Sequence, residues 1–216
     1  MEAIIFDMDG VLIDSHSVST QMLCETANEY GCNLTIHEVY SWGSLSSRQF
    51  WSKVKATYNL SQELNELINS YDVDREIEKY KSIGLIPGVR EVLIEIKKQG
   101  IKTAIATSAS RKRMNAVIDI FELNDYFDQY ICDDEVKVSK PDPEIFLLAA
   151  KKLGVHPSLC VVIEDSNNGL RAAKSAGMKC IGYKGLPHIH ENMDEADILI
   201  TEFKRITIKD IEGLFQ

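Results

Sequence analysis

The sequence predicts an α/β protein: a parallel sheet with helices on both faces, and an all-helical insert after the first strand. Two observations support this fold class. Helices that end at a glycine are repeatedly followed by short apolar, β-branched runs in residues 84–216, whereas residues 15–83 show only helical spacing of apolar side chains. Strands that alternate with helices form parallel sheets, because parallel neighbours require a long crossover. We therefore expect a core domain of residues 1–14 and 84–216, and a helical domain of residues 15–83.

The first strand is expected at residues 4–6, where Ile-Ile-Phe leads directly into Asp7-Met8-Asp9-Gly10. Loops that follow parallel strands lie at the edge of the sheet where ligands bind. Two carboxylates at this edge require a neutralising cation, and Mg²⁺ prefers a few carboxylate oxygens together with substrate phosphate. Asp-x-Asp-Gly also occurs in tight turns and calcium loops, so this stretch alone leaves those interpretations open.

The insert is expected to contain several amphipathic helices. Apolar residues recur at three- and four-residue intervals in residues 18–30, 50–58 and 64–71, and the last stripe continues through Ile77 and Tyr80. This spacing is typical of helices that bury one face. Gly31 would end the first helix.

Three helix–glycine–strand units make up most of the remaining chain. The helices are expected at residues 89–98, 144–152 and 168–175, and the strands that follow them at 102–106, 160–163 and 179–182. A lysine near the end of each helix and the glycine after it both suit a helix C-terminus. A weaker strand at 198–200 and a helix around 207–215 complete the predicted core domain.

Three further segments of this core carry polar residues that could join the first two aspartates. The run Thr107-Ser108-Ala109-Ser110 offers hydroxyls and backbone N–H groups, which suit a phosphate site or simply cap the next helix. Glu164 and Asp165 follow another strand and could bind a cation or begin a helix. Lys140 precedes a proline, which restricts its backbone to an extended conformation and fixes its direction; otherwise it is a solvated surface lysine.

The composition is that of an ordinary soluble globular protein and argues against several function classes. The chain has 216 residues and a net charge of −9, which disfavours generic binding of nucleic acid. The N-terminal residues lack a basic region, and no stretch is long enough to span a membrane. The five cysteines include no Cys-x-x-Cys pair and are expected to be small buried side chains in a reducing compartment. We expect a cytoplasmic protein without nucleic-acid or membrane partners.

Taken together, four ordered segments resemble the motifs of the haloacid dehalogenase-like hydrolase superfamily. They are Asp7-Met8-Asp9-Gly10-Val11-Leu12, Thr107-Ser108-Ala109-Ser110, Ser139-Lys140-Pro141-Asp142-Pro143 and Glu164-Asp165-Ser166-Asn167-Asn168-Gly169. The resemblance covers essentially the whole chain. The helical insert is similar to the cap of the β-phosphoglucomutase and phosphoglycolate phosphatase group. It implies a Rossmann-like core domain with an inserted helical cap domain.

The resemblance also implies roles for individual residues. Asp7 would be the nucleophile that forms an aspartyl-phosphate, and Asp9 the acid and base for the leaving oxygen and the attacking water. Ser108 and the amide of Ala109 would hold phosphate oxygens, and Lys140 would neutralise the nucleophile and the phosphate. The Mg²⁺ ligands would be Asp7, the carbonyl of Asp9 and Asp165. Glu164 would be either a further ligand or a residue that contacts the ligands without binding the ion.

The function implied is Mg²⁺-dependent hydrolysis of a small phosphomonoester, such as a sugar phosphate or a related metabolite. The alternative is a sugar-phosphate mutase, but β-phosphoglucomutases carry a histidine where this chain has Ser19. A non-enzymatic phosphoacceptor switch would not need a helical cap. Arg48, which follows the segment 43–47, is a candidate for binding the rest of the substrate, and the alternative is a solvated helix residue. The sequence is compatible with a monomer and determines neither the oligomeric state nor the substrate.

Overall fold

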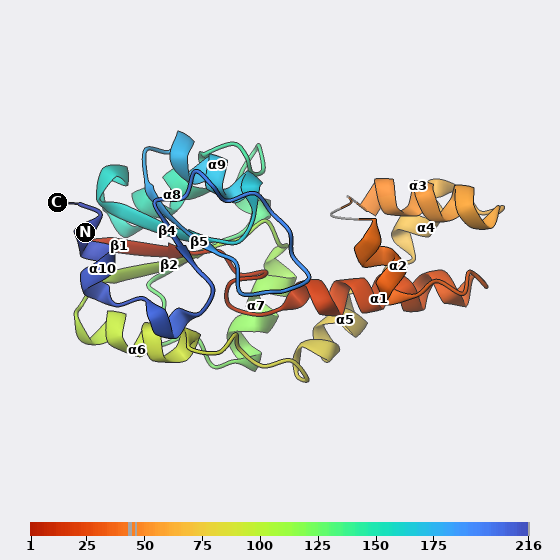
Figure 1. Ribbon diagram of the computed structural model, residues 1–216, viewed down its shortest axis with the longest axis horizontal. Coiled ribbons are helices and arrows are strands. Elements are labelled where there is room, and N and C mark those ends of the chain that lie inside the picture. The colour runs from red at the N-terminus through yellow and green to blue at the C-terminus, as the bar shows by residue number, and fades with distance from the viewer. Residues whose placement is uncertain (43–44, 46, 216) are drawn as a thin grey trace. The chain divides into compact units, whose positions relative to one another are not determined.

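The computed structural model describes residues 1–42, 45 and 47–215 and confirms the predicted α/β fold class (Figure 1). The chain divides into two compact units. One consists of Met1–Asp14 and Ile83–Gln216, and the other of Ser15–Ser82. We call them the core unit and the helical unit and describe each by itself.

A six-stranded, fully parallel sheet forms the centre of the core unit. Its strands are β1 (Ala3–Phe6), β2 (Lys102–Ala106), β3 (Gln129–Ile131), β4 (Cys160–Glu164), β5 (Lys179–Tyr183) and β6 (Ile198–Ile200). Their order is β3-β2-β1-β4-β5-β6. This order is that of a Rossmann-like sheet, which reverses its winding direction between β1 and β4, and ligands bind outside the carboxyl ends of the strands at such a point.

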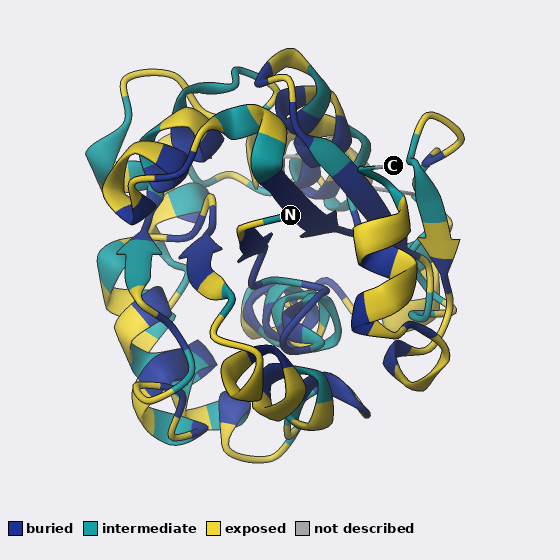
Figure 2. Ribbon diagram, turned by 90° about the vertical axis from the view of Figure 1, so that its left-hand side faces the viewer, coloured by how far each residue is buried: buried dark blue, intermediate teal, exposed yellow. Residues whose placement is uncertain are grey.

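Helices cover both faces of this sheet. They are α6 (Val89–Lys98), α7 (Arg111–Ile120), α8 (Glu144–Leu153), α9 (Asn167–Ser175) and α10 (Ile208–Gly213), with short 3₁₀ turns at Asp133–Glu135, Pro157–Leu159 and Phe203–Arg205. In Figure 1, α8 and α9 lie on one face of the sheet, and α6 and α7 on the other. Figure 2 shows the central strands buried and the exposed residues on the outer surfaces of the helices.

The strands are apolar on both faces because both faces are covered. Alternate residues of neighbouring strands, such as Ile5 and Val162, pack with Phe146 and Ala149 of α8 in one cluster. The residues between them, such as Phe6, point to the opposite face and are equally buried. β1 lies between β2 and β4 and is buried on both faces. The segment that begins at Asp7 therefore starts from a well-packed strand.

The predicted helix–glycine–strand units are present, and α8 illustrates why. Its last turn carries Lys151 and Lys152, which suit the negative end of the helix dipole. Gly154 follows with φ of 66°, a left-handed conformation that is inexpensive only for glycine. The strand β3 was not among the predicted strands, because its residues are Gln-Tyr-Ile and only Ile131 is buried, whereas the equally short β6 is Ile-Leu-Ile.

The helical unit consists of α1 (Ser15–Glu29), α2 (Ile36–Ser41), α3 (Ser47–Tyr58), α4 (Leu64–Asn69) and α5 (Val73–Tyr80). None of its described residues lies in a β-strand. The single stripe expected from residue 64 to residue 80 is two helices, because the Asp72 side chain accepts from the N–H groups of Asp74 and Arg75 and starts α5 anew. Phe50 and Trp51 lie at the centre of its core.

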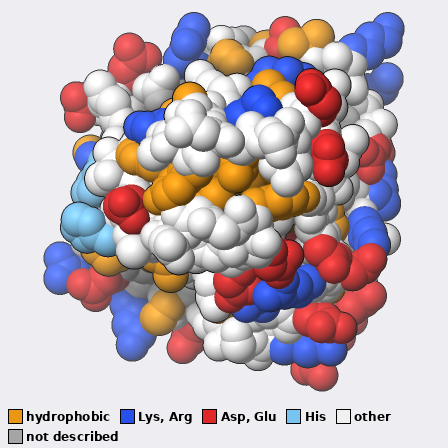
Figure 3. Space-filling view, turned by 90° about the vertical axis from the view of Figure 1, so that its right-hand side faces the viewer, with side chains coloured by type: hydrophobic (Ala, Val, Ile, Leu, Met, Phe, Trp, Pro, Cys, Tyr) orange, Lys and Arg blue, Asp and Glu red, His pale blue; other side chains and the backbone are white. Residues whose placement is uncertain are grey.

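Figure 3 shows one face of the protein, with a group of apolar side chains at the surface and acidic and basic side chains around it. Among the helices that the structure describes, none combines the length and the apolar character that a membrane crossing requires. All five cysteines are buried, and none forms a disulfide.

Candidate active site

Three of the predicted site residues meet around one buried ammonium group. The Nζ atom of Lys140 lies 2.5 Å from Oδ1 of Asp7 and 2.7 Å from Oε1 of Glu164, and it also donates to the carbonyl of Ala106 at 3.0 Å. The side chains of Lys140, Asp7 and Glu164 are only 5%, 8% and 1% exposed. Residues 7, 140 and 164 are far apart in sequence, so the sheet edge brings them together as the parallel topology predicts.

The electrostatics of this cluster follow from burial and charge. Burial raises the pKa of Asp7 well above its usual range, and the neighbouring carboxylates of Glu164, Asp165 and Asp9 raise it further, although Lys140 opposes them. Burial alone would lower the pKa of Lys140, but the carboxylates of Asp7 and Glu164 outweigh it and raise that pKa. Lys140 therefore stays charged, and the raised pKa of Asp7 means that this one lysine does not offset burial and the neighbouring carboxyl groups.

Glu164 is held from two directions. One carboxylate oxygen accepts from Lys140, while the other accepts from the backbone N–H and the hydroxyl of Ser166, both at 2.9 Å. The carboxylate also fills the space where a side chain on Gly169 would begin. Because both oxygens are engaged, Glu164 is suited to holding Lys140 in place.

Asp9 lies in the turn after β1. Gly10 has φ of 79°, and its N–H donates to the carbonyl of Ile13 at 2.8 Å, which folds the chain back. Oδ1 of Asp9 lies 3.0 Å from Nη2 of Arg113, and Oδ2 accepts from the hydroxyl of Thr107 at 3.3 Å. Sequence reasoning missed Arg113, because its contact spans 104 residues.

The segment after β2 caps a helix, which is one of the two interpretations left open by the sequence, and the phosphate site stays a prediction. Ser110 caps α7, since its hydroxyl accepts from the backbone N–H of Arg113 at 3.5 Å. Ser108 is exposed and available to a ligand. Ala109 is buried, and its N–H donates to the hydroxyl of Thr107 at 3.0 Å. The segment is therefore a helix start in which the buried Thr107 hydroxyl contacts Asp9 and the exposed Ser108 follows directly in sequence.

The residues at this edge form a donor set that fits Mg²⁺. The carboxyl groups of Asp9, Glu164 and Asp165 all lie within electrostatic range of Asp7, and Lys140 and Arg113 are the cations paired with them. No described group of three or more His, Cys, Asp or Glu side chains is arranged as a complete metal site. Mg²⁺ does not need one, since it is commonly bound by one or two carboxylates, water and substrate phosphate.

Two predicted features belong to the helical unit. Arg48 is in α3, where its Nη2 lies 3.2 Å from Oδ1 of Asn65. Gly43, Ser44 and Ser46, which precede it, lie outside the described residues. Ser19 is in α1 and donates to Oε1 of Glu76 at 3.0 Å.

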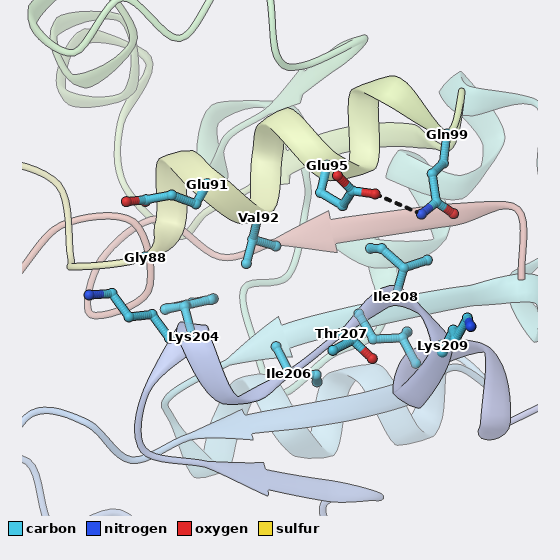
Figure 4. Close-up of a pocket in the computed structure, with 12 residues that line it drawn as sticks. Gly88, Glu91, Val92, Glu95, Gln99, Lys204, Ile206, Thr207, Ile208 and Lys209 are labelled. Carbon is cyan, nitrogen blue, oxygen red and sulfur yellow. Dashed lines mark hydrogen bonds between the residues drawn. The ribbon is translucent and has the colours of Figure 1, made fainter.

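A separate cavity of about 490 Å³ lies between α6 and the C-terminal segment of the core unit (Figure 4). Val92, Ile206 and Ile208 form apolar parts of its lining, with Glu95 and Lys209 among the charged ones. None of the predicted site residues is among the described residues that line it, so this cavity is not part of the candidate active site.

Comparison with known proteins identifies relatives over most of the chain. A family model for haloacid dehalogenase-like hydrolases matches residues 1–177. The chain is 34% identical over 181 residues to "Phosphorylated carbohydrates phosphatase" from Thermotoga maritima, covering 84% of each protein. It is 31% identical over 220 residues to "Hexitol phosphatase B" from Escherichia coli K12, covering 98% of this chain and 96% of that protein. A relative from Arabidopsis thaliana is much longer, and the chain spans 18% of it.

A solved structure of a β-phosphoglucomutase from Clostridium difficile matches with a TM-score of 0.77 and 25% identity, covering 99% of this chain and 96% of that one. The resemblance of the four motifs is thus confirmed by both sequence and fold. Membership of an enzyme family leaves the phosphoacceptor switch without support. The chain belongs to the haloacid dehalogenase-like hydrolases.

Proposed function

We propose that this protein is a Mg²⁺-dependent phosphatase that hydrolyses a small phosphomonoester, a sugar phosphate or related metabolite, through an aspartyl-phosphate on Asp7. The observation that carries the proposal is the buried contact of Lys140 with both Asp7 and Glu164. The phosphatase names of two relatives that match most of the chain favour phosphorylated carbohydrates as the substrate class.

In the first step, a carboxylate oxygen of Asp7 attacks phosphorus while the bond from phosphorus to the leaving oxygen breaks. Two anions repel each other, so the attack requires fixed positive charge, which Lys140 supplies. Asp9 gives its proton to the leaving oxygen. The hydroxyl of Ser108 and the N–H of Ala109 are proposed to hold the phosphoryl oxygens, which requires the Ala109 N–H to turn from Thr107 to the ligand.

In the second step, water attacks the phosphorus of the aspartyl-phosphate, Asp9 takes up a proton from that water, and the Asp7 carboxylate leaves with phosphate released. Asp9 thereby returns to its protonated form for the next cycle. A residue that serves both as acid and base typically contributes on the order of a hundredfold or more to the rate.

The proposed ligands of Mg²⁺ are Asp7, the carbonyl of Asp9 and Asp165. Glu164 would act indirectly, by holding Lys140 in place. The ion, when bound, supplies charge that lets an anionic nucleophile approach an anionic phosphate.

Arg48 is proposed to contact the part of the substrate beyond the phosphate. We place the activity in the cytoplasm because all five cysteines are buried and unpaired.

The second candidate function is a sugar-phosphate mutase, which the structural match to a β-phosphoglucomutase favours. In a mutase, the aspartyl-phosphate passes its phosphoryl group to another hydroxyl of the sugar instead of to water. Ser19 stands where those enzymes carry a histidine, and its hydroxyl is engaged with Glu76. We therefore prefer hydrolysis.

The test is a panel of phosphomonoesters assayed both for released phosphate and for isomer formation. We expect phosphate release with Mg²⁺ and its loss in Asp7→Asn. Isomer formation that requires a bisphosphate activator, with little free phosphate, would establish the mutase instead. Wild-type turnover by Asp7→Asn would refute the assignment of the nucleophile. Asp119→Asn, which changes an exposed aspartate of α7, is the matched control.

A further inference from the structure

The carboxylate of Asp9 is held at both of its oxygens by side chains from the β2–α7 segment. Arg113 reaches Oδ1 from the first turn of α7, and Thr107 reaches Oδ2 from the end of β2. The roles implied by the four motifs do not include Arg113. All three residues belong to the core unit, so these contacts do not depend on the helical unit.

The position of Arg113 on the backbone is well defined. It is the third residue of α7, and its N–H is capped by the Ser110 hydroxyl. The guanidinium is planar and permanently charged, so it binds a carboxylate oxygen in a directed way. An arginine on a fixed helical turn therefore restricts where Asp9 can place its carboxyl group.

Thr107 completes the arrangement. A hydroxyl has one proton to donate, and that of Thr107 is free to donate to Asp9 because it accepts from the N–H of Ala109. The Thr107 side chain is fully buried, so its hydroxyl has little freedom. Asp9 is thereby connected to the same backbone N–H that is proposed to hold phosphate.

We propose that Arg113 is a positioning residue for the acid–base carboxyl group of Asp9. This inference rests on the proposed function. An acid must lie within hydrogen-bond reach of the oxygen that it protonates, and small displacements are costly. Arg113 and Thr107 fix the two carboxylate oxygens relative to the end of β2, which pairs with β1, the strand that Asp7 follows. Arg113 acts through Asp9 and touches neither reacting atom.

The principal test compares Arg113→Met with wild type on two substrates that differ in the leaving group. An alkyl phosphate has a leaving oxygen that needs a proton, whereas p-nitrophenyl phosphate does not. We expect kcat to fall about tenfold or more on the alkyl ester, with a smaller loss on the nitrophenyl ester and little change in KM. Arg113→Lys should restore part of kcat. Arg205→Met removes the same charge from an exposed ion pair with Glu202 and should leave both activities unchanged.

The same substitution in an Asp9→Asn background separates positioning from a general structural effect. If Arg113 acts through Asp9, Arg113→Met lowers kcat no further once Asp9 is replaced. Equal losses on both esters, or an undiminished loss in the Asp9→Asn background, would overturn the proposal. If Arg113→Met does not fold, the losses of kcat on the two esters are compared in Arg113→Lys and Thr107→Val instead.

A second measurement does not depend on activity. The effects of Arg113→Met and Asp9→Asn on the urea midpoint of unfolding should be non-additive, because the two side chains interact directly. Additive effects would show that the contact does not exist in solution and would overturn the proposal. A protein that shows this coupling but releases no phosphate from any ester would instead refute the proposed function.

Discussion

The carboxylate of Glu164 occupies the space in which a side chain at position 169 would have to begin. Gly169 lies in the first turn of α9, and Glu164 is the last residue of β4. Because Glu164 also accepts from Lys140, the missing side chain at position 169 determines where the ammonium group sits. A glycine in α9 thus helps to place the positive charge beside the proposed nucleophile, Asp7, which follows β1.

Gly169→Ala should therefore damage the site. The added methyl group forces Glu164 aside, and Lys140 loses its position beside Asp7. We expect kcat to fall about 10- to 100-fold and unfolding to become easier by about 1–3 kcal/mol. Steady-state kinetics and urea unfolding measure the two effects. Gly213→Ala is the matched control, since a Cβ there meets open space and alanine favours the helix. Unchanged kcat in Gly169→Ala would contradict this account.

Mg²⁺ should stabilise the folded protein through the acidic edge. A ligand that binds only the folded state, at ten times its dissociation constant, adds about 1.4 kcal/mol to the free energy of unfolding. We expect Mg²⁺ to raise the unfolding temperature of wild type, and Asp165→Asn to remove most of this effect. Sodium chloride at equal ionic strength controls for screening. EDTA should abolish phosphate release, and excess Mg²⁺ should restore it. A full Mg²⁺ response in Asp165→Asn would exclude that residue as a ligand.

Asp197 should make stability depend on acid pH. Burial opposes its ionisation, but hydrogen bonds from Lys174 and from the N–H of Cys180 outweigh this and lower its pKa below the usual 3.8. Since the folded state has the lower pKa, the stabilisation is present in full above about pH 4 and is lost as the pH falls below it. Asp197→Asn should destabilise by about 1–2 kcal/mol at pH 7 and by less at pH 3.

Urea unfolding of wild type and Asp197→Asn at both pH values measures this difference. Asp194→Asn, at an exposed position nearby, is the control and should be close to wild type. A destabilisation by Asp197→Asn that is the same at pH 3 and pH 7 would show that the charge of the carboxylate is not its cause.

The cysteines should be unreactive in the native protein. Burial raises the pKa of Cys24 and of Cys160 to about 11, so their thiols stay protonated at neutral pH as well as shielded. With a chromogenic disulfide reagent at pH 8, we expect native thiols to react on the order of a hundredfold more slowly than in the unfolded chain. In guanidinium chloride all five should react. Prompt release of one equivalent from the native protein would contradict the buried placement.

Much of the fold could be predicted because its signals are local. The apolar run that ends at Asp7 and the lysines and glycine that end α8 are readable within a few residues. The break between α4 and α5 was missed because the apolar spacing continues through it, while the side chain of Asp72 starts a new helix.

The site was predicted only in part, for a physical reason. Asp7, Lys140 and Glu164 could be grouped because each lies in a recognisable motif, and the structure places them in contact. Their catalytic roles stay predictions. The contact of Arg113 with Asp9 depends on how α7 packs against the sheet, so no pattern in its own segment reveals it.

The place of β1 between β2 and β4 has a consequence for synthesis on the ribosome. β1 emerges first, yet its two partners follow about 100 and 160 residues later. The strand that Asp7 follows therefore stays unpaired while the helical unit is synthesised. A nascent or truncated chain that stops before Cys160 contains Asp7 but lacks Glu164, the residue that holds Lys140. We therefore expect such incomplete chains to have no phosphatase activity.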